Sequence, residues 1–201
     1  MKILAVADIE DKLLYDHFDK KRVEGVELIV GCGDLRSDYI DFLISMINVP
    51  MIYVRGNHDD GQIKEPPLGA ICIEDRIFEY NGVKFMGLGG SYRYNPNGKN
   101  MYTEREMKLR ALRMRPKAML KGGVDVLVTH SPAKGYGDLE DLPHRGFDTF
   151  NDIMNKYHPE FMVHGHVHMN YGRIKKEYDH PSGTKIINAC GFSIIDVTPG
   201  Q

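Results

Sequence analysis

Residues that commonly bind metal ions occur in several short clusters along the chain. The five clusters are Asp8-Ile9-Glu10, Gly33-Asp34, Gly56-Asn57-His58-Asp59, Thr129-His130 and His164-Gly165-His166-Val167-His168. Each cluster follows an apolar run that has the length of a buried β-strand. Carboxylates, an amide and imidazoles together supply the ligands that a pair of divalent metal ions needs. Two such ions side by side are a common device for attacking a phosphate ester with water.

The amino-terminal half of the chain is expected to alternate strands and helices. We predict strands at 2–7, 26–31 and 51–54, and helices at about 12–22 and 39–47. This order predicts parallel strands that are connected by right-handed crossovers. Ligand sites in open α/β sheets lie just beyond the carboxyl ends of such strands, where the clusters occur.

The spacing within two clusters also favours a shared site. Asp8 and Glu10 are two residues apart, so in an extended segment their side chains point to the same side. The same holds for His166 and His168. Gly33 and Gly165 leave room for the backbone to approach an ion or a phosphate closely.

The rest of the chain is richer in strands. Residues 76–80 and 83–88 flank Asn81-Gly82, which suits a type I′ hairpin turn. A capping box at 103–106 should start a helix that runs to about Arg115, where Pro116 should kink or end it. The remaining expected elements are a strand at 124–129, a helix at 147–157, and strands at 160–164, 171–178, 185–189 and 192–197. We therefore expect one domain, 1–201, of mixed α/β class with helices covering a two-sheet core.

The bulk composition narrows the class of protein. Hydrophobic residues make up 42% of the 201 residues and charged residues 27%, as in ordinary globular proteins. The net charge of −2 argues against nucleic acid as the main partner, although local basic patches stay possible. No apolar run approaches the ~20 residues of a membrane span, and the amino end enters a strand pattern without a signal peptide. Three cysteines without CxxC spacing indicate neither disulfides nor a zinc knuckle, so we expect a cytoplasmic protein.

Taken in order, the clusters resemble the motifs of the calcineurin-like metallophosphoesterase family. Those motifs are Asp-x-His, Gly-Asp, Gly-Asn-His-Asp/Glu, a lone His after a strand, and Gly-His-x-His. The resemblance runs from Asp8 to His168 and looks most like the branch of small, bacterial-type phosphodiesterases. It implies a two-sheet mixed β-sandwich flanked by helices, an αββα arrangement.

The resemblance also implies a role for each matching residue. The implied metal ligands are Asp8 and His168 for the first ion, Asn57, His130 and His166 for the second, and Asp34 between the two. His58 would stand off the metals and protonate the leaving oxygen, which suits a side chain whose pKa is ordinarily about 6.5. Asp59 could orient His58 or cap nearby backbone, and both interpretations stay open.

Glu10 departs from the family pattern, which has His at this position. Glu10 could bind the first metal directly, which would favour harder ions such as Mn²⁺, Mg²⁺ or iron over zinc. It could instead reach the metal through water and weaken that site, or the site could have decayed. We favour direct binding, because carboxylate is a competent ligand and the other motif positions match.

Two loop residues are further candidates for binding the substrate. Arg93 follows a strand, and guanidinium suits phosphate well. His144 lies in a polar loop, close enough after His130 to overhang the metals. Both loops are equally compatible with ordinary surface.

These observations predict a small metal-dependent phosphoesterase. Two divalent cations, Mn²⁺ in the first place and Fe, Mg²⁺ or Zn²⁺ as alternatives, would hold a bridging hydroxide that attacks the phosphorus, with His58 as general acid. The expected partner is a small soluble phosphate ester, with phosphodiesters favoured over monoesters because no large cap is inserted. Two other interpretations stay open: a nuclease of the same superfamily, and a decayed metal-binding scaffold that serves as an interaction module.

Overall fold

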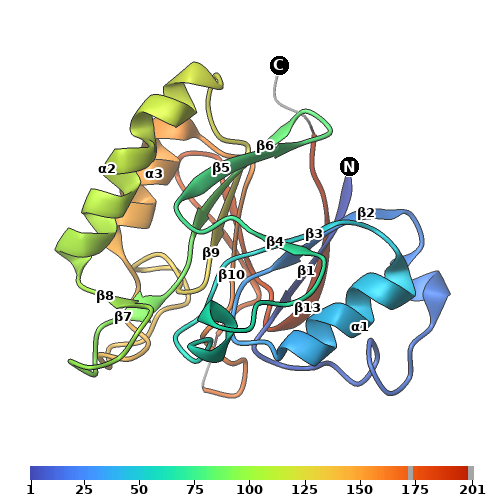
Figure 1. The fold of residues 1–201 in the computed structure, drawn as a ribbon. Coiled ribbons are helices and arrows are strands. Elements are labelled where there is room, and N and C mark those ends of the chain that lie inside the picture. The colour runs from blue at the N-terminus through green and yellow to red at the C-terminus, as the bar shows by residue number, and fades with distance from the viewer. Residues whose placement is uncertain (172–173, 199–201) are drawn as a thin grey trace.

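Two β-sheets face each other at the centre of the molecule, and helices cover their outer faces (Figure 1). The computed structural model describes residues 1–171 and 174–198. A cluster of buried aliphatic and aromatic side chains fills the space between the sheets, including Ala5, Val30 and Ile52 from one and Phe85 and Val163 from the other. The mixed α/β sandwich that was predicted is therefore confirmed.

The first sheet has five strands in the order β13-β1-β2-β3-β4. These strands are β1 (Lys2–Ala7), β2 (Val26–Gly31), β3 (Met51–Tyr53), β4 (Ala70–Cys72) and β13 (Gly191–Asp196). β1 to β4 run parallel, and β13 pairs antiparallel with β1. Helix α1 (Ser37–Ile47) covers the outer face, where Leu43 packs with Leu4 and Ile29.

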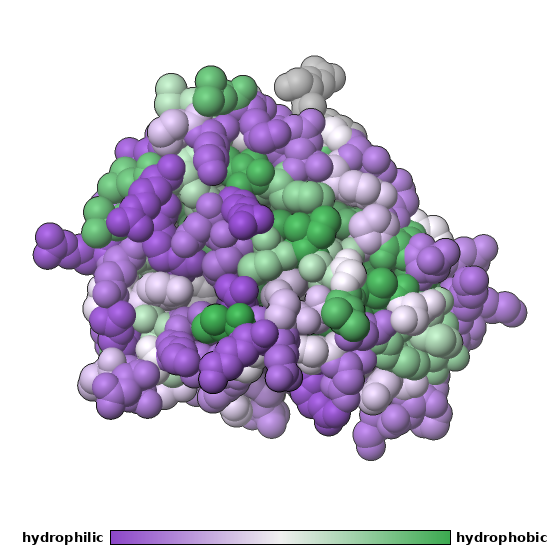
Figure 2. Space-filling model, viewed as in Figure 1, coloured by the Kyte–Doolittle hydropathy of each residue, from purple (hydrophilic) through white to green (hydrophobic). Residues whose placement is uncertain are grey.

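The second sheet has six strands in the order β11-β12-β10-β9-β6-β5. These strands are β5 (Arg76–Tyr80), β6 (Val83–Leu88), β9 (Val126–Thr129), β10 (Phe161–His164), β11 (Glu177–Asp179) and β12 (Lys185–Asn188). The four inner strands are parallel and the two edge strands antiparallel. Helices α2 (Glu104–Leu120) and α3 (Asp148–Tyr157) cover its outer face, and the surface over α2 is largely hydrophilic (Figure 2).

Local sequence signals explain several element boundaries. Asn81 and Gly82 both have positive φ, 49° and 79°, as a type I′ turn requires, and they join β5 to β6. Thr103 and Glu106 form the predicted capping box at the start of α2. No helix in the described ranges is both long and apolar enough to cross a membrane.

Three sequence expectations for secondary structure differ from the structure. The helix expected at 12–22 is a series of turns followed by a 3₁₀-helix at Lys20–Val23, which Asp19 caps by accepting a hydrogen bond from the Lys21 amide. Helix α2 continues past Pro116 to Leu120, because the buried Met114 and Ala118 hold its last turns on the second sheet.

The strand expected at 171–178 is reduced to the short β11 (Glu177–Asp179), and residues 172–173 lie outside the described residues. Three short strands were not expected: β4 at the edge of the first sheet, and the pair β7 (Ser91–Tyr92) and β8 (Met101–Tyr102), which forms a small sheet of its own.

One charged side chain of α2 is buried against the second sheet. Arg110 is only 6% exposed and forms ion pairs with Glu74 and Asp75. Its guanidinium also donates to the Gly89 carbonyl at 2.8 Å. Glu74 in turn accepts hydrogen bonds from the backbone amides of Gly89 and Arg55. Arg110 therefore links α2 to the segment that leads into Gly56-Asn57-His58.

Replacing Arg110 by Met should destabilise the protein strongly. The substitution keeps an apolar stem but removes the arginine partner of the largely buried Glu74 carboxylate, and loss of one partner of a buried pair typically costs about 3–5 kcal/mol. The free energy of unfolding from urea denaturation measures this. The matched control is Lys108→Met on the same helix, whose ion pair with Asp152 is more than half exposed and should cost less than about 1 kcal/mol. Equal losses in the two variants would contradict a special role for Arg110.

Candidate metal centre

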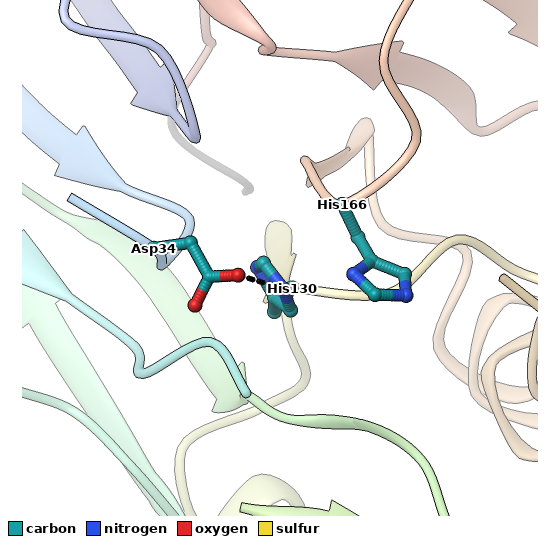
Figure 3. A group of neighbouring side chains, drawn as sticks. All are labelled: Asp34, His130 and His166. Carbon is teal, nitrogen blue, oxygen red and sulfur yellow. Dashed lines mark ion pairs between the residues drawn. The ribbon is translucent and has the colours of Figure 1, made fainter. Parts of the chain in front are cut away.

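The candidate ligands converge where strands of the two sheets end. Asp8 follows β1 and Asp34 follows β2 in the first sheet, whereas His130 follows β9 and His166 follows β10 in the second. One possible ligand atom from each of Asp34, His130 and His166 lies within 4.8 Å of those of the other two (Figure 3). Residues that are far apart in sequence thus form one cluster at the junction of the sheets.

Asp34 and His130 form a buried ion pair across this junction. Their Oδ2 and Nε2 atoms are 3.3 Å apart, and His130 Nδ1 is 2.8 Å from the Cys32 carbonyl oxygen. Burial alone would lower the pKa of His130, but the nearby Asp34 carboxylate raises that pKa to about 9. Burial would raise the pKa of Asp34, and His130 opposes it so that the pKa is lowered to about 2. A positive charge beside Asp34 is therefore what keeps its carboxylate ionised in this largely buried position.

Asn57 lies against the same pair and is only 5% exposed. Its Oδ1 is 3.0 Å from His130 Nε2, on the side of the cluster. Its Nδ2 donates to the Tyr94 hydroxyl at 3.2 Å. The amide oxygen is therefore the end of Asn57 that faces the other ligands.

Asp8 and His166 meet on the other side of the cluster. The Asp8 Oδ2 atom accepts a hydrogen bond from the His166 backbone amide at 2.8 Å. Burial raises the pKa of Asp8, and His130 only partly opposes this. Burial, with a further contribution from His130, lowers the pKa of His166 to about 3, so its imidazole is neutral and able to bind a metal. His166 Nε2 lies 2.8 Å from the Pro143 carbonyl oxygen.

Three of these residues have a left-handed backbone conformation. The φ angles are 59° at Asp8, 55° at Asp34 and 68° at His166. This conformation is uncommon for residues with a side chain, and it concentrates at functional sites. It bends the chain directly after each strand and so determines where the side chain points.

Glycines let the segments around the cluster approach one another. A Cβ on Gly165 would overlap Asp8 Oδ2, and a Cβ on Gly56 would overlap Asp34 Oδ1. A Cβ on Gly33 would meet the backbone nitrogen of Gly56, and Gly33 also has a φ of +92°. Gly33 and Gly165 thus allow close contact with neighbouring segments of the protein, and the expected approach to an ion or a phosphate stays a prediction.

His58 and Asp59 differ in exposure and in their hydrogen-bond partners. His58 is exposed, and its backbone amide donates to Asp34 Oδ1 at 2.8 Å. Asp59 is buried, and its Oδ2 accepts from the amides of Asp34 and Gly56 at 2.8 and 2.7 Å. Its Oδ1 accepts from Gln62 Nε2 at 3.0 Å. Both oxygens of Asp59 thus engage groups other than the His58 imidazole, which favours the capping interpretation.

Glu10 and His168 lie outside the group of three donors. Glu10 Oε1 is 3.6 Å from Nε of Arg36, an exposed arginine that also pairs with Asp38. The His168 ring lies 5.1 Å from the ring of Tyr171. Neither residue is among the three grouped donors, and we call the two the rim residues of the cluster.

The two predicted substrate residues are placed differently. The His144 ring packs 5.3 Å from that of His166, so it overhangs the cluster as expected, and its Nδ1 is 2.6 Å from Asp141 Oδ2. Arg93 is directed instead to the start of α2, where it pairs with Glu106 at 3.0 Å. Phosphate binding by Arg93 would require this ion pair to break.

Two contacts of the cluster were missed by the sequence reasoning. These are the Tyr94 hydroxyl on Asn57 and the Pro143 carbonyl on His166. They lie in the same two loops as Arg93 and His144, whose charged or titratable side chains are the more obvious candidates from sequence. Sequence spacing does not distinguish Tyr94 from Arg93, because side chains in a loop do not alternate with the regular period of a helix or a strand.

The donor set fits divalent metal ions. It combines the partly buried carboxylates of Asp8 and Asp34 with the buried amide oxygen of Asn57 and the buried imidazoles of His130 and His166. The residues that would hold the ions are Asp8, Asp34, Asn57, His130 and His166, with Glu10 and His168 at the rim. A cation there would supply the positive charge that Asp34 now obtains from His130.

Comparison with known proteins shows which family model this chain matches and which solved structures share its fold. The family model described as calcineurin-like phosphoesterase matches residues 1–170. The curated UPF0046 protein T07D4.2 of Caenorhabditis elegans is 28% identical over 123 residues. That match covers 60% of this chain but only 28% of the length of the relative.

Solved structures show the same fold at low sequence identity. One crystal structure superposes with a TM-score of 0.69 at 15% identity, covering 97% of this chain and 94% of the other. The structure of TT1561 of Thermus thermophilus gives a TM-score of 0.61 at 14% identity, covering 94% and 89% of the two chains. A novel archaeal phosphodiesterase superposes more loosely, with a TM-score of 0.46 at 18% identity and coverage of 98% and 93%, a likeness too low to bear on function.

Replacing Gly165 by Ala should disturb the cluster. The added Cβ overlaps Asp8 Oδ2 and the Ala7 side chain, so the Asp8 carboxylate must move. We expect a loss of about 1–3 kcal/mol in the free energy of unfolding, together with weaker Mn²⁺ binding in calorimetry. The control is Gly61→Ala, where no atom lies within 4 Å of the new Cβ and a change within about 0.5 kcal/mol is expected. Wild-type Mn²⁺ binding by Gly165→Ala would contradict the assigned position of Asp8.

Proposed function

Because the chain belongs to the calcineurin-like phosphoesterase family, we propose that it is a two-metal phosphoesterase that acts on small phosphodiesters. The observation that carries this proposal is the buried cluster of Asp34, His130 and His166, with the exposed His58 attached to it through the Asp34 carboxylate. Such a cluster unites a cation site with a proton donor that faces the solvent.

The ligand set supports particular metals. Two divalent cations would supply an activated water as nucleophile and would neutralise charge on the phosphoryl oxygens. Asp34 would lie between them, with Asp8, His168 and Glu10 on one side. Asn57, His130 and His166 would serve the other side. The share of carboxylate on the Glu10 side favours Mn²⁺, with Fe and Mg²⁺ as alternatives and Zn²⁺ less favoured.

His58 is the proposed general acid. Its side chain is exposed, whereas its backbone is held by the hydrogen bond to Asp34 Oδ1 at 2.8 Å. The imidazole is thus kept beside the cluster without being one of its buried donors. It would give its proton to the leaving oxygen of the ester. Asp59 supports this role indirectly by binding the backbone amides of the loop.

The charges at the rim favour a diester over a monoester. A monoester is a dianion near neutral pH and needs more positive charge around it than a diester monoanion. Two arginines of the site loops already have carboxylate partners, Arg36 with Glu10 and Arg93 with Glu106. The net charge of −2 likewise does not favour a long nucleic acid. We therefore propose a small soluble phosphodiester as the partner.

The state of the cysteines supports a reducing compartment. Cys32, Cys72 and Cys190 are all free thiols, and Cys32 and Cys190 are buried. Thiols persist in the cytoplasm, where disulfides are rare. We propose the cytoplasm as the place where the protein acts.

The proposal is tested by hydrolysis of bis-p-nitrophenyl phosphate and p-nitrophenyl phosphate. Chelated protein that is refilled with Mn²⁺ should bind about two ions per chain and hydrolyse the diester faster than the monoester. His58→Ala should retain Mn²⁺ and lose about 10²- to 10⁴-fold in turnover, with greater losses for esters whose leaving groups are poor.

Other results of this experiment would contradict parts of the proposal. Equal losses across leaving groups would remove the general-acid role of His58. At most one tightly bound Mn²⁺ would overturn the two-metal site. Metal binding without turnover of either ester would favour the metal-binding scaffold, and activity on DNA that falls steeply with salt would favour the nuclease.

Replacing Glu10 by His tests how this residue meets the metal. If Glu10 binds directly, an imidazole in its place should raise the affinity for Zn²⁺ relative to Mn²⁺, because nitrogen is the softer ligand. Competitive titration with the two ions measures the ratio. The control is Glu27→His, an exposed position on β2 at which the ratio should not change. An unchanged ratio in Glu10→His would remove Glu10 from the ligands.

A further inference from the structure

We propose that Tyr94 is a positioning residue of the metal centre, which holds the side-chain amide of Asn57 so that Oδ1 is presented to the metal. This inference rests on the proposed function, because it takes Asn57 as a ligand. Arg93, in turn, is assigned as the residue that ties Tyr94 in place. The loop that carries Arg93 and Tyr94 would then orient a metal ligand, and other groups would bind the phosphate.

The contact between Tyr94 and Asn57 fixes the amide from its outer side. Asn57 Nδ2 donates to the Tyr94 hydroxyl at 3.2 Å, while Oδ1 lies 3.0 Å from His130 Nε2. The two ends of an amide are similar in shape but opposite in hydrogen bonding, so an unconstrained amide can rotate. Tyr94 fixes the plane and the depth of the group, and His130 selects the oxygen as the inner end. A cation then meets an oxygen that is already in place.

Burial makes this positioning consequential. Asn57 is 5% exposed and Tyr94 is 36% exposed, so the amide is the enclosed partner of this contact. A buried NH₂ group that loses its acceptor costs about 1–3 kcal/mol. Without the hydroxyl, His130 alone would orient the amide, and its oxygen would be held less firmly in the cluster.

The loop that carries Tyr94 is tied to the rest of the protein through Arg93. Its Nη2 donates to Glu106 Oε1 at 3.0 Å and to the Met101 carbonyl at 3.1 Å. Its backbone amide donates to the Tyr102 carbonyl at 3.0 Å. Arg93 therefore joins the start of the loop to β8 and to the first turn of α2. The same residue that sequence reasoning assigned to phosphate serves as the tether for its neighbour.

The capping box of α2 makes this tether firm. Glu106 Oε2 accepts from the Thr103 backbone amide at 2.7 Å, while Oε1 receives Arg93. One carboxylate thus caps the helix and binds the loop. The position of Tyr94 is linked by hydrogen bonds and ion pairs to a helix that packs on the second sheet.

The test is calorimetric titration of the chelated full-length chain with Mn²⁺, without any ester present. Tyr94→Phe keeps the ring and removes only the hydroxyl. We expect one of the two Mn²⁺ sites to weaken by about 10- to 100-fold, which is typical when a residue that orients a metal ligand is lost. The matched control is Tyr80→Phe, which removes a hydroxyl on β5, far from the loop, and should leave both affinities within twofold. Affinities within twofold of wild type in Tyr94→Phe would overturn the inference.

Arg93 is tested by a double-mutant cycle with Tyr94. Arg93→Ala should weaken the same Mn²⁺ site, and Arg93→Lys should restore part of the affinity. The double variant should bind Mn²⁺ no more weakly than Tyr94→Phe alone, because both substitutions disrupt the same positioning of Asn57. Unchanged Mn²⁺ affinity in Arg93→Ala, together with a raised KM for bis-p-nitrophenyl phosphate, would overturn the tether and return Arg93 to the substrate.

The readouts separate this inference from the proposed function. If Tyr94→Phe weakens Mn²⁺ binding but the wild-type protein hydrolyses neither ester, the inference stands and the proposed function fails. If the wild type hydrolyses the diester and Tyr94→Phe binds Mn²⁺ as tightly, the inference fails and the proposed function stands. No Mn²⁺ binding by the wild type would overturn both.

Discussion

The buried ion pair between Asp34 and His130 joins the two sheets at the end where the site lies. Asp34 follows β2 and His130 follows β9, and their side chains approach to 3.3 Å. Burial opposes the charge on each, yet the pair shifts the two pKa values apart, to about 2 for Asp34 and about 9 for His130. Separating the two residues would leave an unpaired buried charge. The pair therefore fixes the position of one sheet relative to the other at this end.

The backbone around this pair adopts energetically unfavourable conformations that bring the charged groups together. Asp8, Asp34 and His166 all have positive φ, and Gly33 and Gly165 remove side chains that would collide with their neighbours. Such conformations persist only where the surrounding structure determines them. Here the cores on either side do so, because β10 is buried throughout, β1 is buried beyond Lys2, and β2 is buried except at Glu27. The stability of the sandwich thus holds the strained turns in place.

The sequence predicted the interior of the site better than its rim. Apolar runs followed by Asp34, His130 and His166 predicted that these residues meet, because parallel strands bring their ends to one edge. The hairpin at Asn81-Gly82 and the sandwich itself were predicted for similar reasons of local chemistry and burial. The helix expected at 12–22 was wrong, because turns and a 3₁₀-helix capped by Asp19 occupy this segment. Helix α2 does not end at Pro116, because its buried residues hold the last turns on the second sheet. The partner of Arg93 could not be predicted, since it depends on how a loop lies against α2.

This division between interior and rim also bears on how a phosphate would be attracted. Arg36 and Arg93 pair with Glu10 and Glu106, so these rim arginines add little net positive charge. The chain as a whole carries a net charge of −2. Cations inside the cluster would add the attraction for an anionic ester that these two arginines do not supply, because low polarity strengthens the field of a cation. Under the proposed function, the bound metal ions therefore supply the positive charge that attracts the ester. The residues that orient the metal ligands then also affect the affinity for the ester.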